Sequence, residues 1–128
     1  MKRLKGDVVV IGAGVTGTAV ARELARYQVK VFLVEKYPDV ACGCTKANTA
    51  IVHAGYDATP GTWKAKLNVR GAAVYPQVCR ELEVEFKPTG SLVVALAEDQ
   101  VPHLYDLLNR GYVNGVPDLK IIGREQLL

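Results

Sequence analysis

The feature that most constrains the fold is a glycine turn set between an apolar run and a helix-favouring segment. Residues 7–11 read Asp-Val-Val-Val-Ile, a short run typical of a strand buried on both faces. The turn occupies residues 12–17, Gly-Ala-Gly-Val-Thr-Gly, and the alanine-rich residues 18–27 favour a helix. Residues 29–35 then read as a second buried strand that ends in a charge. This order predicts a right-handed β-α-β unit.

Each glycine of the turn has a physical task if the turn binds a dinucleotide. Gly12 permits the tight turn, Gly14 lets the backbone approach a pyrophosphate, and Gly17 allows close contact between helix and strand. The free N–H groups where the helix begins, at Val15 and Thr16, together with the positive end of the helix dipole, hold the anion. The alternative is a glycine turn used only for packing.

Glu35 strengthens the dinucleotide interpretation. It ends the second strand at close to the spacing of roughly 20 residues at which a carboxylate meets the adenosine ribose. Its carboxylate can accept hydrogen bonds from the two ribose hydroxyls, whereas a 2′-phosphate would meet a negative charge, so NADP is disfavoured. The context therefore predicts an adenine-dinucleotide site in an α/β, Rossmann-like FAD/NAD(P)-binding fold.

The rest of the chain predicts further elements. Trp63 to Leu82 has its apolar residues on one helical face, and Pro76 should kink that helix or split it in two. Asp99 can cap a helix that ends near Gly115. Strands are expected at residues 91–96 and 119–122, and a helix begins at residues 124–128.

Composition narrows the classes of function. The chain has 128 residues with a net charge of +3, and it has neither the dense basic patch nor the interleaved aromatic residues of a nucleic-acid-binding protein. No run of about 18 apolar residues predicts a transmembrane segment. The three cysteines form no pairing framework, which favours a reducing, cytoplasmic setting, and Cys42 and Cys44 have no further ligands nearby, so no metal site is expected.

The glycine turn alone does not decide between FAD and NAD, but the loop after Glu35 helps. This loop is rich in small and hydroxylic residues, and it offers backbone amides and the Thr45 hydroxyl to phosphate or ribityl oxygens. Asn48 can both donate and accept hydrogen bonds. On the residues alone, His53 on an apolar strand is more often a hydrogen-bonded core histidine than a ligand.

The sequence resembles the FAD-dependent oxidoreductases of the D-amino-acid-oxidase superfamily. The segments that carry the resemblance are DVVVIGAGVTGTAVARELARY, VFLVEK, TKANTAIVHAGYDATPGTWKAKLNVRG and GSLVVALAED, of which the third is the most specific. Within the superfamily the chain is most similar to the bacterial FAD-dependent glycerol-3-phosphate dehydrogenases, with the L-2-hydroxyglutarate oxidases as near relatives. Cys44 departs from the family pattern, in which a hydroxyl residue is usual.

The resemblance implies a role for each residue of the cofactor site. Gly12, Gly14 and Gly17 bind the FAD pyrophosphate, Glu35 binds the adenosine ribose, and Lys36 flanks the adenosine. Further along, the residues implied to lie beside the pyrophosphate, the ribityl chain and then the flavin ring are Thr45, Lys46, Asn48 and Ala50 to His53. Ala54 and Gly55 leave room for a flat ring, and the His53 imidazole would stabilise charge on the reduced flavin.

By this resemblance, the chain is the N-terminal part of an FAD enzyme that transfers a hydride from sn-glycerol 3-phosphate to the flavin. Residues 1–85 belong to the FAD-binding domain, and residues 86–128 begin a mixed α+β substrate domain. The expected partners are a hydroxy-acid or polyol-phosphate substrate and either the remainder of the polypeptide or a redox protein. The expected location is cytoplasmic or peripheral at the inner membrane face. The alternatives are L-2-hydroxyglutarate oxidation, an inactive fragment, and an NAD-binding module without catalysis.

Overall fold

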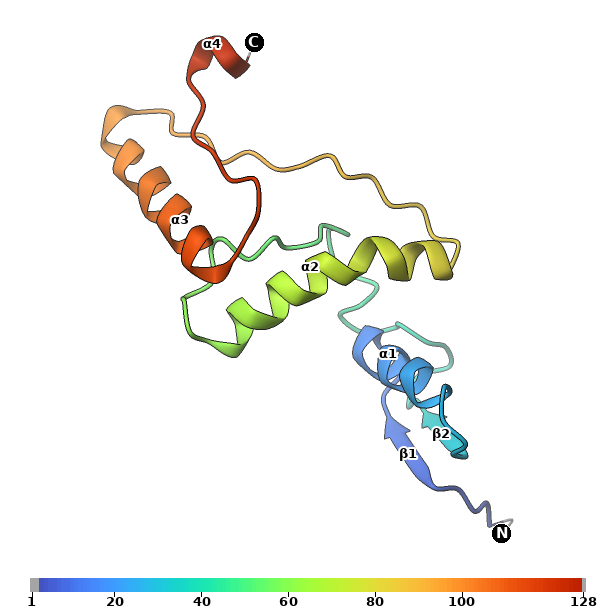
Figure 1. Cartoon of the computed structure of the whole chain (residues 1–128). Helices are drawn as coiled ribbons and strands as arrows, with labels where there is room; N and C mark the ends of the chain where they lie inside the picture. Colours follow the sequence, from blue (N-terminus) through green and yellow to red (C-terminus); the bar gives the residue numbers. More distant parts are fainter. Residues whose placement is uncertain (1–2, 128) are drawn as a thin grey trace. The chain divides into compact units, whose positions relative to one another are not determined.

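The chain forms two compact units. The computed structural model describes residues 3–127, and the chain divides into Met1–Ile51 and Val52–Leu128 (Figure 1). The predicted domain boundary near residue 85 does not coincide with this division, and it stays a prediction.

The first unit is the predicted β-α-β element. Strands β1 (Val8–Ile11) and β2 (Val31–Val34) pair in parallel, with Val8 opposite Val31 and Ile11 opposite Val34. Helix α1 (Val15–Leu24) connects them and packs against both strands (Figure 1). The Gly12 N–H donates to the Val34 carbonyl at 2.8 Å, which extends the pairing into the turn. The predicted Rossmann-like α/β arrangement is confirmed.

The prediction that both strands are buried on both faces is wrong for the described residues. Along β1 the exposure alternates: Val8 and Val10 are half-buried, whereas Val9 is 57% and Ile11 86% exposed. A Cβ added at Gly17 of α1 would lie 3.5 Å from Val10 Cγ1, so the half-buried face is the one that meets the helix. Within the first unit the other face of this two-stranded sheet is exposed, because the described residues of that unit form a single helix.

The second unit is helical. Its elements are α2 (Trp63–Glu81), the 3-10 helix η1 (Glu98–Gln100), α3 (Val101–Asn114) and α4 (Arg124–Leu127), and α2 and α3 are in contact. Helix α2 continues past Pro76, so the predicted split does not occur. A proline within a helix removes one hydrogen bond to the carbonyl four residues earlier, and the remaining turns of this 19-residue helix sustain it.

Three further predictions for this unit meet mixed outcomes. Asp99 lies inside η1 and does not cap α3, which begins at Val101 with a proline in its first turn. Gly115 ends α3 in the left-handed conformation with φ 81°, as predicted. Residues 91–96 and 119–122 form no strand, because no segment among residues 3–127 pairs with them; the first of these stretches runs as extended chain between α2 and η1 (Figure 1).

The buried residues are small. In the second unit they include Ala58 at 1% and Ala65 at 2% exposure, with Val116 and Cys79 at 6%. No large side chain among the described residues is fully buried. Among the helices of residues 3–127, none has the length and apolar character that crossing a membrane would require.

Candidate cofactor site

The glycine turn has the geometry that its residues predict at two positions. Gly12 adopts φ +97°, a conformation that residues with a side chain rarely adopt, and the space around its missing Cβ is open. Gly17 lies so close to the turn that an added Cβ would sit 1.9 Å from the Gly12 carbonyl oxygen. The turn therefore brings the start of α1 into direct backbone contact with the end of β1.

The loop after β2 brings Thr45 to the start of α1. Gly14 is the N-cap residue of that helix and supplies no side-chain acceptor. The expectation that the Val15 N–H is free is wrong, because it donates to Thr45 Oγ1 at 3.0 Å. A Cβ at Gly14 would lie 3.1 Å from the same oxygen. Thr45 therefore stands at the positive end of the helix dipole, where an anion is also favoured, and Thr16 follows in the first turn of the helix.

Glu35 lies against the same turn. Its Oε2 accepts a hydrogen bond from the Ala13 N–H at 2.7 Å, and its Oε1 accepts from the N–H groups of Lys36 at 2.8 Å and Tyr37 at 3.0 Å. These bonds, the one from Ala13 first, lower the pKa of the Glu35 carboxyl from its ordinary 4.5, so the group is held as a carboxylate. A carboxylate has about four acceptor positions, so Oε2 keeps one for an incoming hydroxyl.

An open cleft of about 690 Å³ lies over these groups. The residues that line it come from the strand ends, the glycine turn and the loop after β2: Ile11, Gly12, Gly14, Val34, residues 35–37 and residues 42–45. The Lys36 ammonium lies over the Tyr37 ring, 4.6 Å from its centroid. The cleft thus brings together a carboxylate, a cation, an aromatic ring and the N-terminus of a helix.

The lining of this cleft leaves out several sequence-predicted residues: Val15, Thr16, Gly17, Lys46, Asn48, Ala50 and His53. The Asn48 side chain shapes its own loop: its Nδ2 donates to the Thr45 carbonyl, and its Oδ1 accepts from the Ala50 N–H at 2.7 Å. Ala50 adopts φ 54°, in the left-handed region. Lys46 is exposed, and its backbone N–H donates to the Gly43 carbonyl at 3.2 Å. The structure gives Asn48 a loop-forming role that the sequence reasoning had not considered.

His53 belongs to the second unit and is exposed. Residues 51–54 are not a strand, so the alternative of a core histidine on an apolar strand is wrong. The proposed approach of His53 to the flavin stays a prediction.

Sequence reasoning missed the contacts that close the loop over the turn. The Ala13 carbonyl accepts from the Ala41 N–H at 2.9 Å, while the Ala13 N–H is the donor to Glu35. Ala41 itself adopts φ 59°. These are backbone contacts of a small residue, and nothing in the type of residue at position 13 or 41 signals them.

The match to known proteins decides the family. Residues 7–128 match the model of the DAO family, FAD-dependent oxidoreductases. The chain belongs to this family. FAD is the cofactor on which the family depends, so the resemblance inferred from the sequence is confirmed.

Curated relatives and a solved structure agree with this family. The chain is 52% identical over 122 residues to a glycerol 3-phosphate dehydrogenase of Caloramator mitchellensis, covering 95% of this chain and 25% of that protein. It is 35% identical over 123 residues to the human mitochondrial L-2-hydroxyglutarate dehydrogenase, covering 94% and 27%. The dithionite-reduced L-α-glycerophosphate oxidase of Mycoplasma pneumoniae, solved with FAD bound, matches with a TM-score of 0.73 and 32% identity over 94% of this chain and 30% of that one. The chain thus spans about a quarter of the length of the curated relatives.

The residues of the cleft fit the adenosine and pyrophosphate end of FAD. A Cβ is excluded at Gly17 by the Gly12 carbonyl, whereas the space beside Gly12 is open to a ligand. The Glu35 carboxylate keeps a free acceptor position for a hydroxyl, and the start of α1 favours an anion. The described residues therefore suit the ribose and the pyrophosphate of an adenosine diphosphate group.

Proposed function

We propose that the chain forms the cofactor-binding N-terminal part of a flavoprotein that oxidises sn-glycerol 3-phosphate to dihydroxyacetone phosphate. The observation that carries the proposal is the 52% identity to a glycerol 3-phosphate dehydrogenase over almost the whole chain. The fold match to an L-α-glycerophosphate oxidase supports the same substrate. The identity to L-2-hydroxyglutarate dehydrogenases is lower, at 33–38%, so that reaction is the alternative.

The proposed site residues divide by the part of FAD that they would hold. Glu35 and Lys36 would bind the adenosine, and Gly12, Gly14, Val15, Thr16, Gly17 and Thr45 would surround the pyrophosphate. Lys46, Asn48 and Ala50 would follow the ribityl chain, and His53 would stand near the flavin ring. Bound FAD would accept the hydride of the substrate carbinol, whose hydroxyl proton leaves to a base.

The partners and the location are proposals as well. The bare face of the two-stranded sheet, with Val9 57% exposed, supports a cover supplied by the remainder of a longer polypeptide. Residues 86–128 would begin its substrate domain. All three cysteines are free, which supports the cytoplasm, with the inner membrane face as the alternative.

Anaerobic reduction of the flavin tests the proposed substrate. The purified full-length protein in which these residues occur is mixed with sn-glycerol 3-phosphate and, separately, with L-2-hydroxyglutarate. We expect glycerol 3-phosphate to bleach the visible flavin absorption in a stopped-flow experiment and L-2-hydroxyglutarate to leave it unchanged. The reverse pattern would establish the alternative substrate, and bleaching by neither would contradict both.

A further inference from the structure

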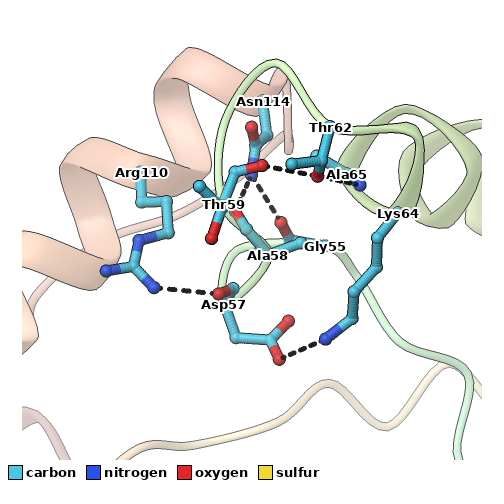
Figure 2. Close-up of polar contacts among 9 residues, drawn as sticks. All are labelled: Gly55, Asp57, Ala58, Thr59, Thr62, Lys64, Ala65, Arg110 and Asn114. Atoms are coloured by element: carbon cyan, nitrogen blue, oxygen red, sulfur yellow. Dashed lines mark hydrogen bonds and ion pairs between the residues drawn. The ribbon is translucent and has the colours of Figure 1, made fainter.

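A loop of the second unit is held between two helices by close backbone packing. Residues 55–62 form this loop, which leads from the His53 segment into α2 (Figure 2). Gly55 adopts φ +105°, and a Cβ there would lie 3.0 Å from Val69 Cγ2 on α2. On the other side, a Cβ at Gly111 of α3 would lie 3.0 Å from Tyr56 Cβ. The loop therefore packs closely against both helices, and the φ of Gly55 favours a glycine there.

Side chains of α3 complete this attachment by binding the carbonyl groups of the loop. Asn114 Nδ2 donates to the carbonyls of Gly55 at 2.9 Å and Ala58 at 2.7 Å. Arg110 donates from a terminal nitrogen to the Asp57 carbonyl at 2.9 Å. Figure 2 shows the three bonds converging on the loop from one helix. An amide nitrogen has two hydrogens, so Asn114 uses its full donor capacity on this loop.

The burial of the same residues makes these bonds important. Gly55 and Ala58 are buried, Ala58 with only 1% exposure, and a buried carbonyl that loses its partner is costly to the folded state. The rest of the loop is anchored at its far end, where Thr62 caps α2 by accepting from the Ala65 N–H at 3.3 Å. Residues 55–62 are thus fixed at both ends, and the segment just before Gly55 leaves from a rigid anchor.

We propose that Asn114, assisted by Arg110, is a positioning residue for the flavin-facing segment 50–54. The inference rests on the proposed function, because that function directs Ala50 to His53 toward the flavin ring. Asn114 acts through the loop that it holds and not by touching flavin or substrate. It fixes the point from which the His53 segment departs, so it sets where that segment stands.

Hydrogen–deuterium exchange with a matched pair of variants tests the attachment. Asn114→Asp keeps the shape of the side chain but removes both donors. Asn109→Asp makes the same change on the exposed face of the same helix, at a side chain with no hydrogen bond among the described residues. In the full-length protein we expect the amides of residues 53–59 to exchange about tenfold faster or more in Asn114→Asp, because two hydrogen bonds are lost, and to be unchanged in Asn109→Asp.

The flavin itself supplies the second readout. We expect Asn114→Asp to alter the visible circular dichroism of the bound flavin and to lower kcat more than it raises KM, while Asn109→Asp alters neither. Faster exchange with an unchanged flavin spectrum and kcat would reduce Asn114 to a structural residue and overturn the inference. Unchanged exchange would overturn it as well.

Two further controls keep the result interpretable. If Asn114→Asp does not fold, Arg110→Met removes a single bond, keeps an apolar stem and should show a smaller change of the same kind in exchange and spectrum. Its lack of effect on both would count against the inference. A wild-type protein without flavin would contradict the proposed function, whereas a wild-type flavoprotein whose spectrum Asn114→Asp leaves unchanged would contradict the positioning role alone.

Discussion

The close contact between Gly17 and the Gly12 carbonyl predicts that Gly17→Ala destabilises the protein. The added Cβ would sit 1.9 Å from the Gly12 carbonyl oxygen and 3.0 Å from its carbon, whereas ordinary contact begins at 3.4 Å. The start of α1 must therefore move by about 1.5 Å, and its obstacle is backbone that cannot rotate aside. Overpacking of this kind costs roughly 1–3 kcal/mol, and we expect the upper end here.

The helix propensity of alanine works in the opposite direction. Replacing a glycine within a helix by alanine contributes about 0.5–1 kcal/mol, so the net loss for Gly17→Ala is about 2 kcal/mol. Gly71→Ala is the matched control, because Gly71 lies within α2 and nothing lies within 4 Å of its added Cβ. That variant should gain about 0.5–1 kcal/mol, and the two should differ by about 3 kcal/mol.

Urea unfolding of the full-length protein measures this difference. With a slope of about 1–3 kcal/mol per molar urea, the midpoints of the two variants should be separated by roughly 1 M or more, with Gly17→Ala the lower. Gly17→Ala should also retain less FAD after purification, because the start of α1 is displaced. Equal midpoints for the two variants would refute the close contact on which the reasoning depends.

Two other predictions concern stability. The pKa of Glu35 is lowered in the folded state, so the ionised carboxyl stabilises the fold above its ordinary pKa of 4.5. This stabilisation is lost as the pH falls below that value. In thermal unfolding, the excess stability of wild type over Glu35→Gln should therefore shrink between about pH 6 and pH 3. A constant difference would contradict the hydrogen bonds to that carboxylate. Thr62→Ala removes the cap of α2 and should lower the free energy of unfolding by about 1 kcal/mol, whereas Thr62→Ser should stay near wild type in the same urea measurement.

The sequence predicted the β-α-β unit well because its signals are local. The apolar runs, the positive φ required at Gly12 and the helix-favouring residues after it all act within one short stretch of chain. The same holds for the end of α3 at Gly115, where the left-handed conformation follows from the type of residue. For Pro76 the sequence left a kink or a split open, and the split does not occur because the remaining turns of the long helix sustain it.

The failures involve contacts between distant residues. Residues 91–96 have the composition of a strand, but a strand needs a partner, and propensity cannot supply one. The hydrogen bonds from Ala13 to Glu35 and from Asn114 to Gly55 join residues far apart in sequence. The bonds of Asn114 to Gly55 and Ala58 gave no signal in the sequence, because an asparagine at the end of a helix is already explained by the way the helix ends.

The turn at Gly12–Gly17 and the loop after it are expected to bind FAD. The most direct test is the visible absorption spectrum of the purified full-length protein, followed by thermal shift of the flavin-free form with FAD and, separately, with NAD. We expect a bound flavin, and stabilisation by FAD that Gly17→Ala weakens and that NAD does not reproduce. A colourless protein that NAD stabilises and FAD does not would contradict the claim.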